Sequence, residues 1–487
     1  MALSADTFFL DPASPGTLQS QIRQSITAAV LSGRLRKGER LPSSRALANH
    51  LGIARITVTL AFQDLVADGY LESRDRSGYF VAPTAPLAEA PRHRKPLPPG
   101  QIDWAEWLDM RHAGARVVEK EAGWQRFKYP FIYGQTDATL FNHTSWRLCA
   151  HQALGKRDFH ALTADYGTSD DPMLLDYIAR HTLPRRGISA APENILITIG
   201  AQNALWLICQ LLLGNGRQAA FENPGYPGLR AILAQFGAAL PVDVDECGLP
   251  PEALPHPAKL VFVTPSHQAP TTVTMPMARR RQLLAQAKAR NMLIVEDDYE
   301  FEMSFSNPPT PALKSLDAEG RVIYVGSFSK SLFPGLRLGY LVAPREFVAE
   351  ARALRATVLR HPPGHIQRTV AYFLALGHYD AQINRMRATF KERRATMHDA
   401  LARHGLQALR GGVSGGTSFW MQTAAGIDSA ALAAALRHDD VLIEPGDPFF
   451  AESGPGSRFY RLAYSSIDAA RIPEGIARIA RAESALR

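Results

Sequence analysis

A lysine inside a turn of small and hydroxyl residues is the group in this chain best suited to covalent chemistry. Lys330 follows an apolar run, residues 322–325, that predicts a buried strand. Ser327 and Ser329 precede the lysine, and Arg337 follows it. A lysine at the end of a buried strand lies in a dry crevice, where its amine pKa falls and it can form a Schiff base. Because two hydroxyls and a guanidinium can also hold a phosphate, the segment fits pyridoxal phosphate (PLP), which needs both.

A carboxylate and a phenol on another predicted strand suit the ring of the same cofactor. The apolar run 292–296 leads into Asp297, Asp298 and Tyr299. Strand alternation places Asp297 and Tyr299 on one face and Asp298 on the other. A PLP ring needs a carboxylate that keeps its pyridine nitrogen protonated, and a phenol can bond its 3′-oxygen. We therefore predict Asp297 and Tyr299 as cofactor ligands, with Asp298 as the alternative carboxylate.

A third candidate is a turn of small residues before a predicted helix. Gly200, Ala201 and Gln202 separate a predicted strand, residues 195–199, from a predicted helix, residues 203–213. The backbone N–H groups at a helix N-terminus bind phosphate well. We predict that these three residues bind the cofactor phosphate.

The elements that must position these groups alternate between apolar strands and helices across residues 124–487. Such alternation predicts an α/β domain with a mostly parallel central sheet. In such sheets the ligand lies beyond the carboxyl ends of the strands, where the candidate residues collect. The candidate strands are 195–199, 259–263, 292–296, 322–325 and 338–342.

Shorter elements near the N-terminus predict a winged helix-turn-helix over residues 17–82. The predicted order is helices 18–31, 44–50 and 55–68, followed by strands 71–74 and 78–81. The third helix of such a fold enters the major groove of DNA. Its first residues reach base edges, so that Arg55 and Thr57 are the candidate base readers.

Contacts to the DNA backbone position such a domain without specifying sequence. The candidates on the second helix are Ser43, which can also cap that helix, and Arg45. The candidates on the wing are Arg74 and Arg76.

Composition and charge narrow the class of protein and the kinds of site that this chain can carry. The chain has 487 residues, a formal net charge of +8 and three cysteines in unrelated contexts. We expect no metal site, no disulfide framework and a reducing compartment. No signal segment or long apolar run is evident, so we expect a cytoplasmic protein without membrane contact. Proline-rich residues 83–123 are expected to form an extended linker between the domains.

The N-terminal motifs resemble those of the GntR family of DNA-binding domains. The match is G-x-L-x-x-G-x-x-L-P-S-x-R-x-L-A over residues 33–48, then L-G at 51–52, T-V at 57–58 and L-x-x-D-G-Y-L at 65–71. The family often has a serine where this chain has Ala54, so one backbone contact to DNA differs.

The large domain resembles fold-type I aminotransferases. Residues 327–339 match S-x-S-K-x6-R-x-G, and residues 222–226 match E-x-P-x-Y, which implies that Tyr226 lies in or at the mouth of the cofactor pocket. Arg461 matches the arginine that binds the α-carboxylate of amino acids, with Arg458 as the alternative. Aminotransferases usually have N-P-x-G where residues 269–272 read A-P-T-T, which argues against full transaminase turnover.

Together these domains resemble the MocR/GabR subfamily of transcriptional regulators. The resemblance implies that PLP binds Lys330 and that an amino acid or amine effector forms an external aldimine there. It also implies a homodimer, head-to-tail, on a double-stranded DNA operator. An active aminotransferase with an accessory winged helix, and a DNA-binding module whose large domain only dimerises, remain alternatives. The effector, the direction of regulation and whether PLP itself is the signal stay open.

Overall fold

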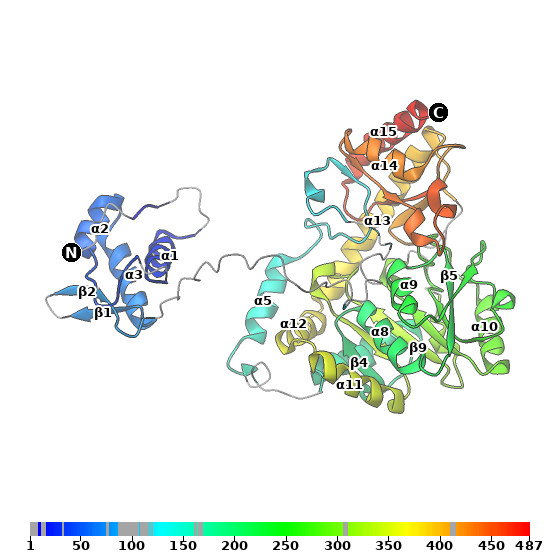
Figure 1. The fold of residues 1–487 in the computed structure, drawn as a ribbon, viewed down its shortest axis with the longest axis horizontal. Coiled ribbons are helices and arrows are strands. Elements are labelled where there is room, and N and C mark those ends of the chain that lie inside the picture. Colours follow the sequence, from blue (N-terminus) through cyan, green and yellow to red (C-terminus); the bar gives the residue numbers. More distant parts are fainter. Residues whose placement is uncertain are drawn as a thin grey trace. The chain divides into compact units, whose positions relative to one another are not determined.

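The computed structural model describes residues 8–10, 16–31, 34–74, 77–85, 107, 116, 118, 120–159, 163, 169–304, 310–409 and 415–487. The chain forms two compact units, Met1–Asp109 and Met110–Arg487 (Figure 1). Each is described by itself.

The first unit has the predicted helix and hairpin order. Apolar residues of α1 recur at helical spacing, and Ile22, Ile26 and Val30 are buried in its core. The wing strands pair antiparallel with Leu71 opposite Val81, which confirms the predicted hairpin. The elements are α1 (Leu18–Leu31), α2 (Ser44–Leu51), α3 (Arg55–Ala67), β1 (Leu71–Arg74) and β2 (Gly78–Val81).

A seven-stranded sheet organises the second unit, in the order β4-β10-β9-β8-β7-β5-β6. Strands β5 to β9 run parallel to one another, and β10 is antiparallel to both β4 and β9. The predicted α/β class with a mostly parallel sheet is therefore confirmed. The strands are β4 (Ile195–Thr198), β5 (Gln218–Asn223), β6 (Ala239–Asp243), β7 (Ala258–Val263), β8 (Leu293–Asp297), β9 (Val322–Ser327) and β10 (Gly339–Val342).

The sequence did not predict β5 and β6. Alanines in β5 give it little of the β-branched character that marks a strand. β6 contains Pro241, which is tolerated because this strand is at the edge of the sheet.

Helices cover both faces of the sheet (Figure 1). Alternate residues of each strand face opposite sides of the sheet, and each side is covered by its own set of helices. On β7, Phe262 packs on one side, while Val261 and Val263 pack on the other. The first set is α8 (Ala201–Leu212), α9 (Pro227–Ala234) and α11 (Arg345–Leu359). The second set is α10 (Met277–Ala289), α12 (Gly364–Ala375) and α13 (His378–Arg403), with α5 (His143–Ala153) against α12.

The C-terminal part adds a three-stranded antiparallel sheet, ordered β11-β14-β13. This sheet places Glu444 directly opposite Arg461. The helices and strands of this C-terminal part are β11 (Ser418–Gln422), α14 (Ser429–Arg437), β13 (Glu444–Pro445), β14 (Phe459–Ala463) and α15 (Ile472–Ala485).

Within the described ranges, no helix is both long and apolar enough to cross a bilayer. The same residues contain no group of three or more His, Cys, Asp or Glu arranged to hold a metal ion.

Candidate cofactor and effector site

The predicted cofactor ligands surround one cavity of about 420 Å³ beyond the carboxyl ends of β8 and β9. This is the edge at which a parallel sheet binds its ligand. The predicted residues in its wall are Ala201, Gln202, Tyr226, Asp297, Tyr299, Ser327, Ser329, Lys330, Arg337 and Arg461. Gly200 directly precedes Ala201.

Lys330 occupies the turn after β9, where its Nζ lies 4.2 Å from the ring centroid of Tyr133. Gly134 has φ +75°, and a Cβ there would come within 2.2 Å of Nζ, so a larger residue at this position would move the amine. Burial, together with the nearby charge of Lys120, lowers the pKa of Lys330 to about 7. A large share of this amine is therefore neutral and nucleophilic at neutral pH.

The two neighbouring aspartates face different surroundings, as strand alternation predicts. Asp297 lines the cavity, and its buried Oδ1 has no hydrogen-bond partner among the described residues. Burial, with the charge of Asp298, raises the pKa of Asp297 to about 7. Asp298 instead accepts hydrogen bonds from Arg186 Nε (2.7 Å) and Tyr324 Oη (2.8 Å).

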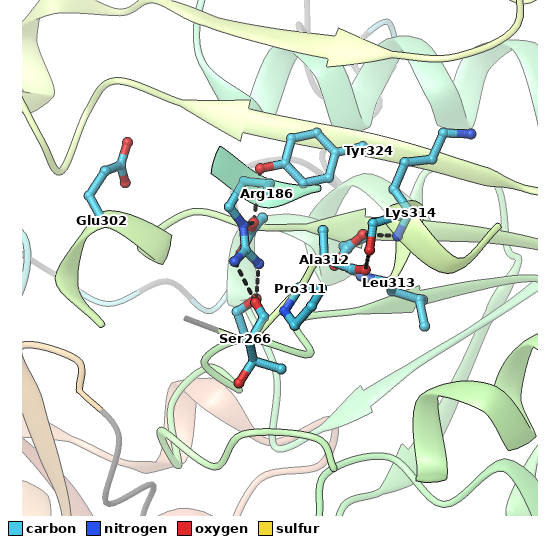
Figure 2. Close-up of polar contacts among 12 residues, drawn as sticks. Arg186, Ser266, Glu302, Pro311, Ala312, Leu313, Lys314 and Tyr324 are labelled. Carbon is cyan, nitrogen blue, oxygen red and sulfur yellow. Dashed lines mark hydrogen bonds and ion pairs between the residues drawn. The ribbon is translucent and has the colours of Figure 1, made fainter. Parts of the chain in front are cut away.

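Arg186, the partner of Asp298, makes two further hydrogen bonds that fix its guanidinium. Figure 2 shows its guanidinium reaching Ser266, whose Oγ lies 2.8 Å from Nη2. Its Nη1 donates to the Thr310 carbonyl at 2.7 Å. Asp298 therefore belongs to a structural ion pair, while Asp297 is the carboxylate offered to the cavity.

Gly200 and Arg337 form a cradle at the start of α8. Gly200 has φ +90°, and a Cβ there would lie 3.1 Å from Arg337 Nη2. Arg337 Nη2 also donates to the Ile199 carbonyl at 3.3 Å. Among the described residues no side chain caps α8, whose N-cap is Gly200, so its first N–H groups are available to an anion.

Hydroxyl groups complete the cradle. Ser327 Oγ accepts a hydrogen bond from the Ser329 N–H at 3.1 Å, which orders the turn that leads to Lys330. Tyr226 Oη donates to Gln202 Oε1 at 3.4 Å. The cavity thus joins an anion cradle, a buried carboxylate without a partner and a nucleophilic lysine, and this donor set fits PLP.

Arg461 lies at another part of the cavity wall and is buried. Its Nε donates to Glu444 Oε2 at 2.8 Å, and its guanidinium carbon lies 4.1 Å and 4.7 Å from the ring centroids of Tyr133 and Phe449. Arg458, the alternative predicted from sequence, is exposed and does not line the cavity. The arrangement favours Arg461 as the effector ligand, which stays a prediction.

The sequence did not predict two residues that line the cavity and contact its charged groups, Tyr133 and Lys120. Tyr133 contacts both Lys330 and Arg461 through its ring. Lys120 donates from Nζ to the Tyr133 carbonyl at 2.7 Å and lines the cavity, although it comes from the predicted linker 83–123. A lysine in a segment with no recognisable motif carries no sequence signal for such a role.

The helix candidates for DNA contact lie at the N-termini of α2 and α3. Arg45 and Arg55 are exposed, Thr57 is half-buried, and Arg55 Nε donates to Ser44 Oγ at 3.3 Å. Ser43 caps α2, since its hydroxyl accepts the backbone N–H three residues later. Their roles in DNA binding stay predictions.

The wing candidates differ in what surrounds them. Arg74 is exposed, pairs with Glu72 at 2.5 Å and lies over the Phe80 ring at 4.3 Å. Arg76 lies outside the described residues.

Two family models match this chain. Residues 18–81 match the bacterial regulatory proteins of the gntR family. Residues 145–479 match aminotransferase class I and II.

Two known regulatory proteins are similar over most of the chain. The HTH-type transcriptional regulator TauR of Rhodobacter capsulatus is 58% identical over 485 residues, covering 99% of this chain and 100% of that protein. The probable rhizopine catabolism regulatory protein MocR of Rhizobium meliloti is 32% identical, covering 81% of this chain and 79% of that protein.

The large unit also resembles solved enzymes. LysN, the α-aminoadipate aminotransferase of Thermus thermophilus, solved with N-(5′-phosphopyridoxyl)-L-leucine, has a TM-score of 0.71 and 29% identity over 79% of this chain and 99% of that one. The cavity, its donor set and these similarities point to the same cofactor and the same two-domain plan. The chain therefore belongs to the MocR-type GntR transcriptional regulators, PLP-dependent DNA-binding proteins that join a helix-turn-helix domain to an aminotransferase class I and II domain.

Proposed function

We propose that this regulator senses an amino acid or amine at Lys330 and changes its binding to a DNA operator in response. The observation that carries the proposal is a nucleophilic lysine and a cation-lined wall in one cavity, on a chain that also carries a DNA-binding domain. Regulation requires that the effector bind two shapes of the protein with different affinities. A coupling of roughly 1–3 kcal/mol is the usual range.

Bound PLP supplies an aldehyde that condenses reversibly with primary amines. Lys330 holds the cofactor, and its lowered pKa helps it exchange with an incoming amine. Asp297 and Arg337 line the same cavity, where Asp297 would share a proton with the ring nitrogen and Arg337 would bind the phosphate. Arg461 offers its guanidinium to an acidic group of the effector.

On the DNA side, we propose that Arg55 and Thr57 read bases while Ser43, Arg45, Arg74 and Arg76 contact phosphates. The proposed organisation is a winged helix over residues 17–82, a linker over 83–123 and an effector domain over 124–487. We further propose that the protein acts as a head-to-tail homodimer in the cytoplasm.

A working aminotransferase is the second candidate. It is favoured by the complete set of Lys330, Asp297 and Arg461 around one cavity. It is opposed by Ala269 in the cavity wall and by Thr272, where aminotransferases usually have asparagine and glycine.

An absorbance scan of the PLP-loaded protein against a panel of amino acids and amines tests the proposal, with Lys330→Ala as control. A band that shifts with one ligand and persists, together with altered binding to operator DNA selected from a random pool, is the expected result. Conversion to the pyridoxamine form that recovers with a keto acid would identify a transaminase instead.

A further inference from the structure

We propose that Lys120 is an effector-contact residue that acts with Arg461 to bind an acidic group. The effector would then be a short primary amine that carries an oxyanion, such as a carboxylate, sulfonate or phosphonate, rather than a simple amine. This inference rests on the proposed sensing function and specifies its ligand class.

Three cations converge on Tyr133. Lys120 Nζ donates to its carbonyl at 2.7 Å, while Lys330 Nζ and the Arg461 guanidinium lie 4.2 Å and 4.1 Å from its ring centroid. All four residues line the same cavity. Since the amine of the effector must reach Lys330, its other end falls among the remaining two cations. Because all three cations contact Tyr133, two through its ring and Lys120 through its carbonyl, they lie close together, which favours a short effector.

Lys120 and Arg461 share one close carboxylate, Glu444, while the charge of Glu300 acts on Lys330. The cofactor phosphate would face Arg337, and its ring nitrogen would face Asp297. Among the described residues, the hydrogen bond from Arg461 to Glu444 uses Nε, which leaves the outer guanidinium nitrogens for a ligand. Lys120 has a neutral carbonyl as its hydrogen-bond partner. An oxyanion between Lys120 and Arg461 would form the charge-assisted hydrogen bonds that this arrangement lacks.

Lys120 is placed to reach such a ligand from the mouth of the cavity. The residue as a whole is exposed, but its ammonium lies in the cavity wall. Burial of that ammonium lowers the pKa of Lys120, with the charge of Glu444 opposing this effect and that of Arg461 adding to it. An added anion would stabilise the protonated form.

Arg116, four residues before Lys120 and on the side of the DNA-binding unit in sequence, is held by residues next to the cavity-lining Phe449. Arg116 Nη2 donates to the carbonyls of Phe450 (3.0 Å) and Ala451 (2.7 Å), and its Nη1 pairs with Asp447 at 3.1 Å. Effector contact at Lys120 would therefore act directly on the chain that connects to the winged helix.

The test compares Lys120→Gln, Lys120→Arg and the control Lys259→Gln, which alters an exposed lysine on β7 away from the cavity. Calorimetry and absorbance of the PLP-loaded proteins measure binding of ethylamine and of analogues that bear a carboxylate, sulfonate or phosphonate on the far carbon. The wild-type chain should prefer the acidic analogues. Lys120→Gln should weaken the best of them by about tenfold or more and change the affinity for ethylamine much less, because ethylamine has no acidic group to lose a contact.

The conservative Lys120→Arg should retain most of the affinity, and Lys259→Gln should match the wild-type chain. Equal binding of ethylamine and all acidic analogues by the wild-type protein would overturn the ligand class, and this result does not depend on whether any variant folds. Unchanged binding by Lys120→Gln would overturn the role of Lys120 alone. If no primary amine altered the wild-type spectrum, the sensing function itself would be wrong.

Discussion

At the scale of single residues, surroundings rather than residue type decide the chemistry of this site. Lys330 and Asp297 both have a pKa of about 7, although one is a base and the other an acid. Burial disfavours the charged form of each, so it lowers the first pKa and raises the second. Both groups can therefore gain or lose a proton at neutral pH.

The lowered pKa of Lys330 predicts the pH dependence of cofactor attachment. The neutral amine attacks, so the rate of attachment of PLP to apo-protein should rise with pH through about 7 and level off above it. A lysine with its usual pKa of 10.5 would show a rate that keeps rising. Stopped-flow absorbance between pH 6 and 9.5 measures this, with Lys330→Ala as the control that shows no attachment. A rate that still climbs at the highest pH would contradict the assignment.

Asp297 and Asp298 provide a matched pair of substitutions. Asp298→Asn removes one partner of a fully buried ion pair with Arg186 and should cost about 3–5 kcal/mol of unfolding free energy. Asp297→Asn should leave the apo-protein as stable or more stable at neutral pH. The raised pKa of Asp297 means that its ionisation costs stability as pH rises above the usual range of a carboxyl group.

The same two substitutions distinguish an effect on the free energy of unfolding from an effect on PLP affinity. Asp297→Asn should weaken PLP binding, because an amide cannot hold the ring nitrogen in its protonated form. Denaturant unfolding of the apo-proteins and titration with PLP provide the two readouts. A large loss of apo stability in Asp297→Asn, or an unaffected Asp298→Asn, would reverse the roles given to the two aspartates.

At the scale of elements, strand ends and helix starts place the functional groups. β8 and β9 deliver Asp297 and the Lys330 turn to the same edge of the sheet because they run parallel as neighbours. In the first unit, the starts of α2 and α3 carry Ser43 and Arg55. A residue at the start of a helix can both cap that helix and contact DNA.

Two substitutions of Ser43 distinguish these roles. Ser43→Ala removes the cap of α2 and should cost about 1 kcal/mol of stability in the first unit. Ser43→Asp retains a capping oxygen but adds a negative charge that would repel a DNA phosphate. We expect its stability to match the wild-type chain and its DNA affinity to fall, measured by thermal unfolding and fluorescence anisotropy at fixed salt. Wild-type DNA affinity of Ser43→Asp would exclude a phosphate contact at this residue.

At the scale of the whole molecule, the chain combines two units with separate cores. The core of the first unit is built from α1, α2, α3 and the wing, while the cofactor cavity lies wholly within the second. A ligand that binds only the native second unit stabilises that unit by mass action.

Calorimetric unfolding should therefore show two transitions, of which PLP raises one. At 100 times its dissociation constant PLP should add about 2.7 kcal/mol to the second unit and raise its midpoint by a few degrees, while the winged-helix midpoint stays unchanged. Lys330→Ala should show a smaller shift. A single transition that PLP raises as a whole would mean that the two units unfold as one cooperative body.

Local patterns in the sequence were enough to predict the fold class and much of the candidate site. Alternation along β8 separates Asp297 from Asp298, and helical spacing marks the core of α1. Such patterns repeat over two to four residues, so they can be recognised without knowing what packs against them. The resemblance to aminotransferases predicted that Tyr226 and Arg461 also belong to this site.

Only the tertiary structure decided which distant residues meet. Lys120, Tyr133 and Glu444 come together with Lys330 and Arg461 from segments far apart in the chain. Their roles arise from charge and distance across the cavity, which no local spacing encodes. The pKa values of the site depend on the same long-range burial. The sequence by itself predicted the cofactor and its candidate residues, because their motifs are local, while the folded chain decided the charge that surrounds them, because that charge comes from distant segments.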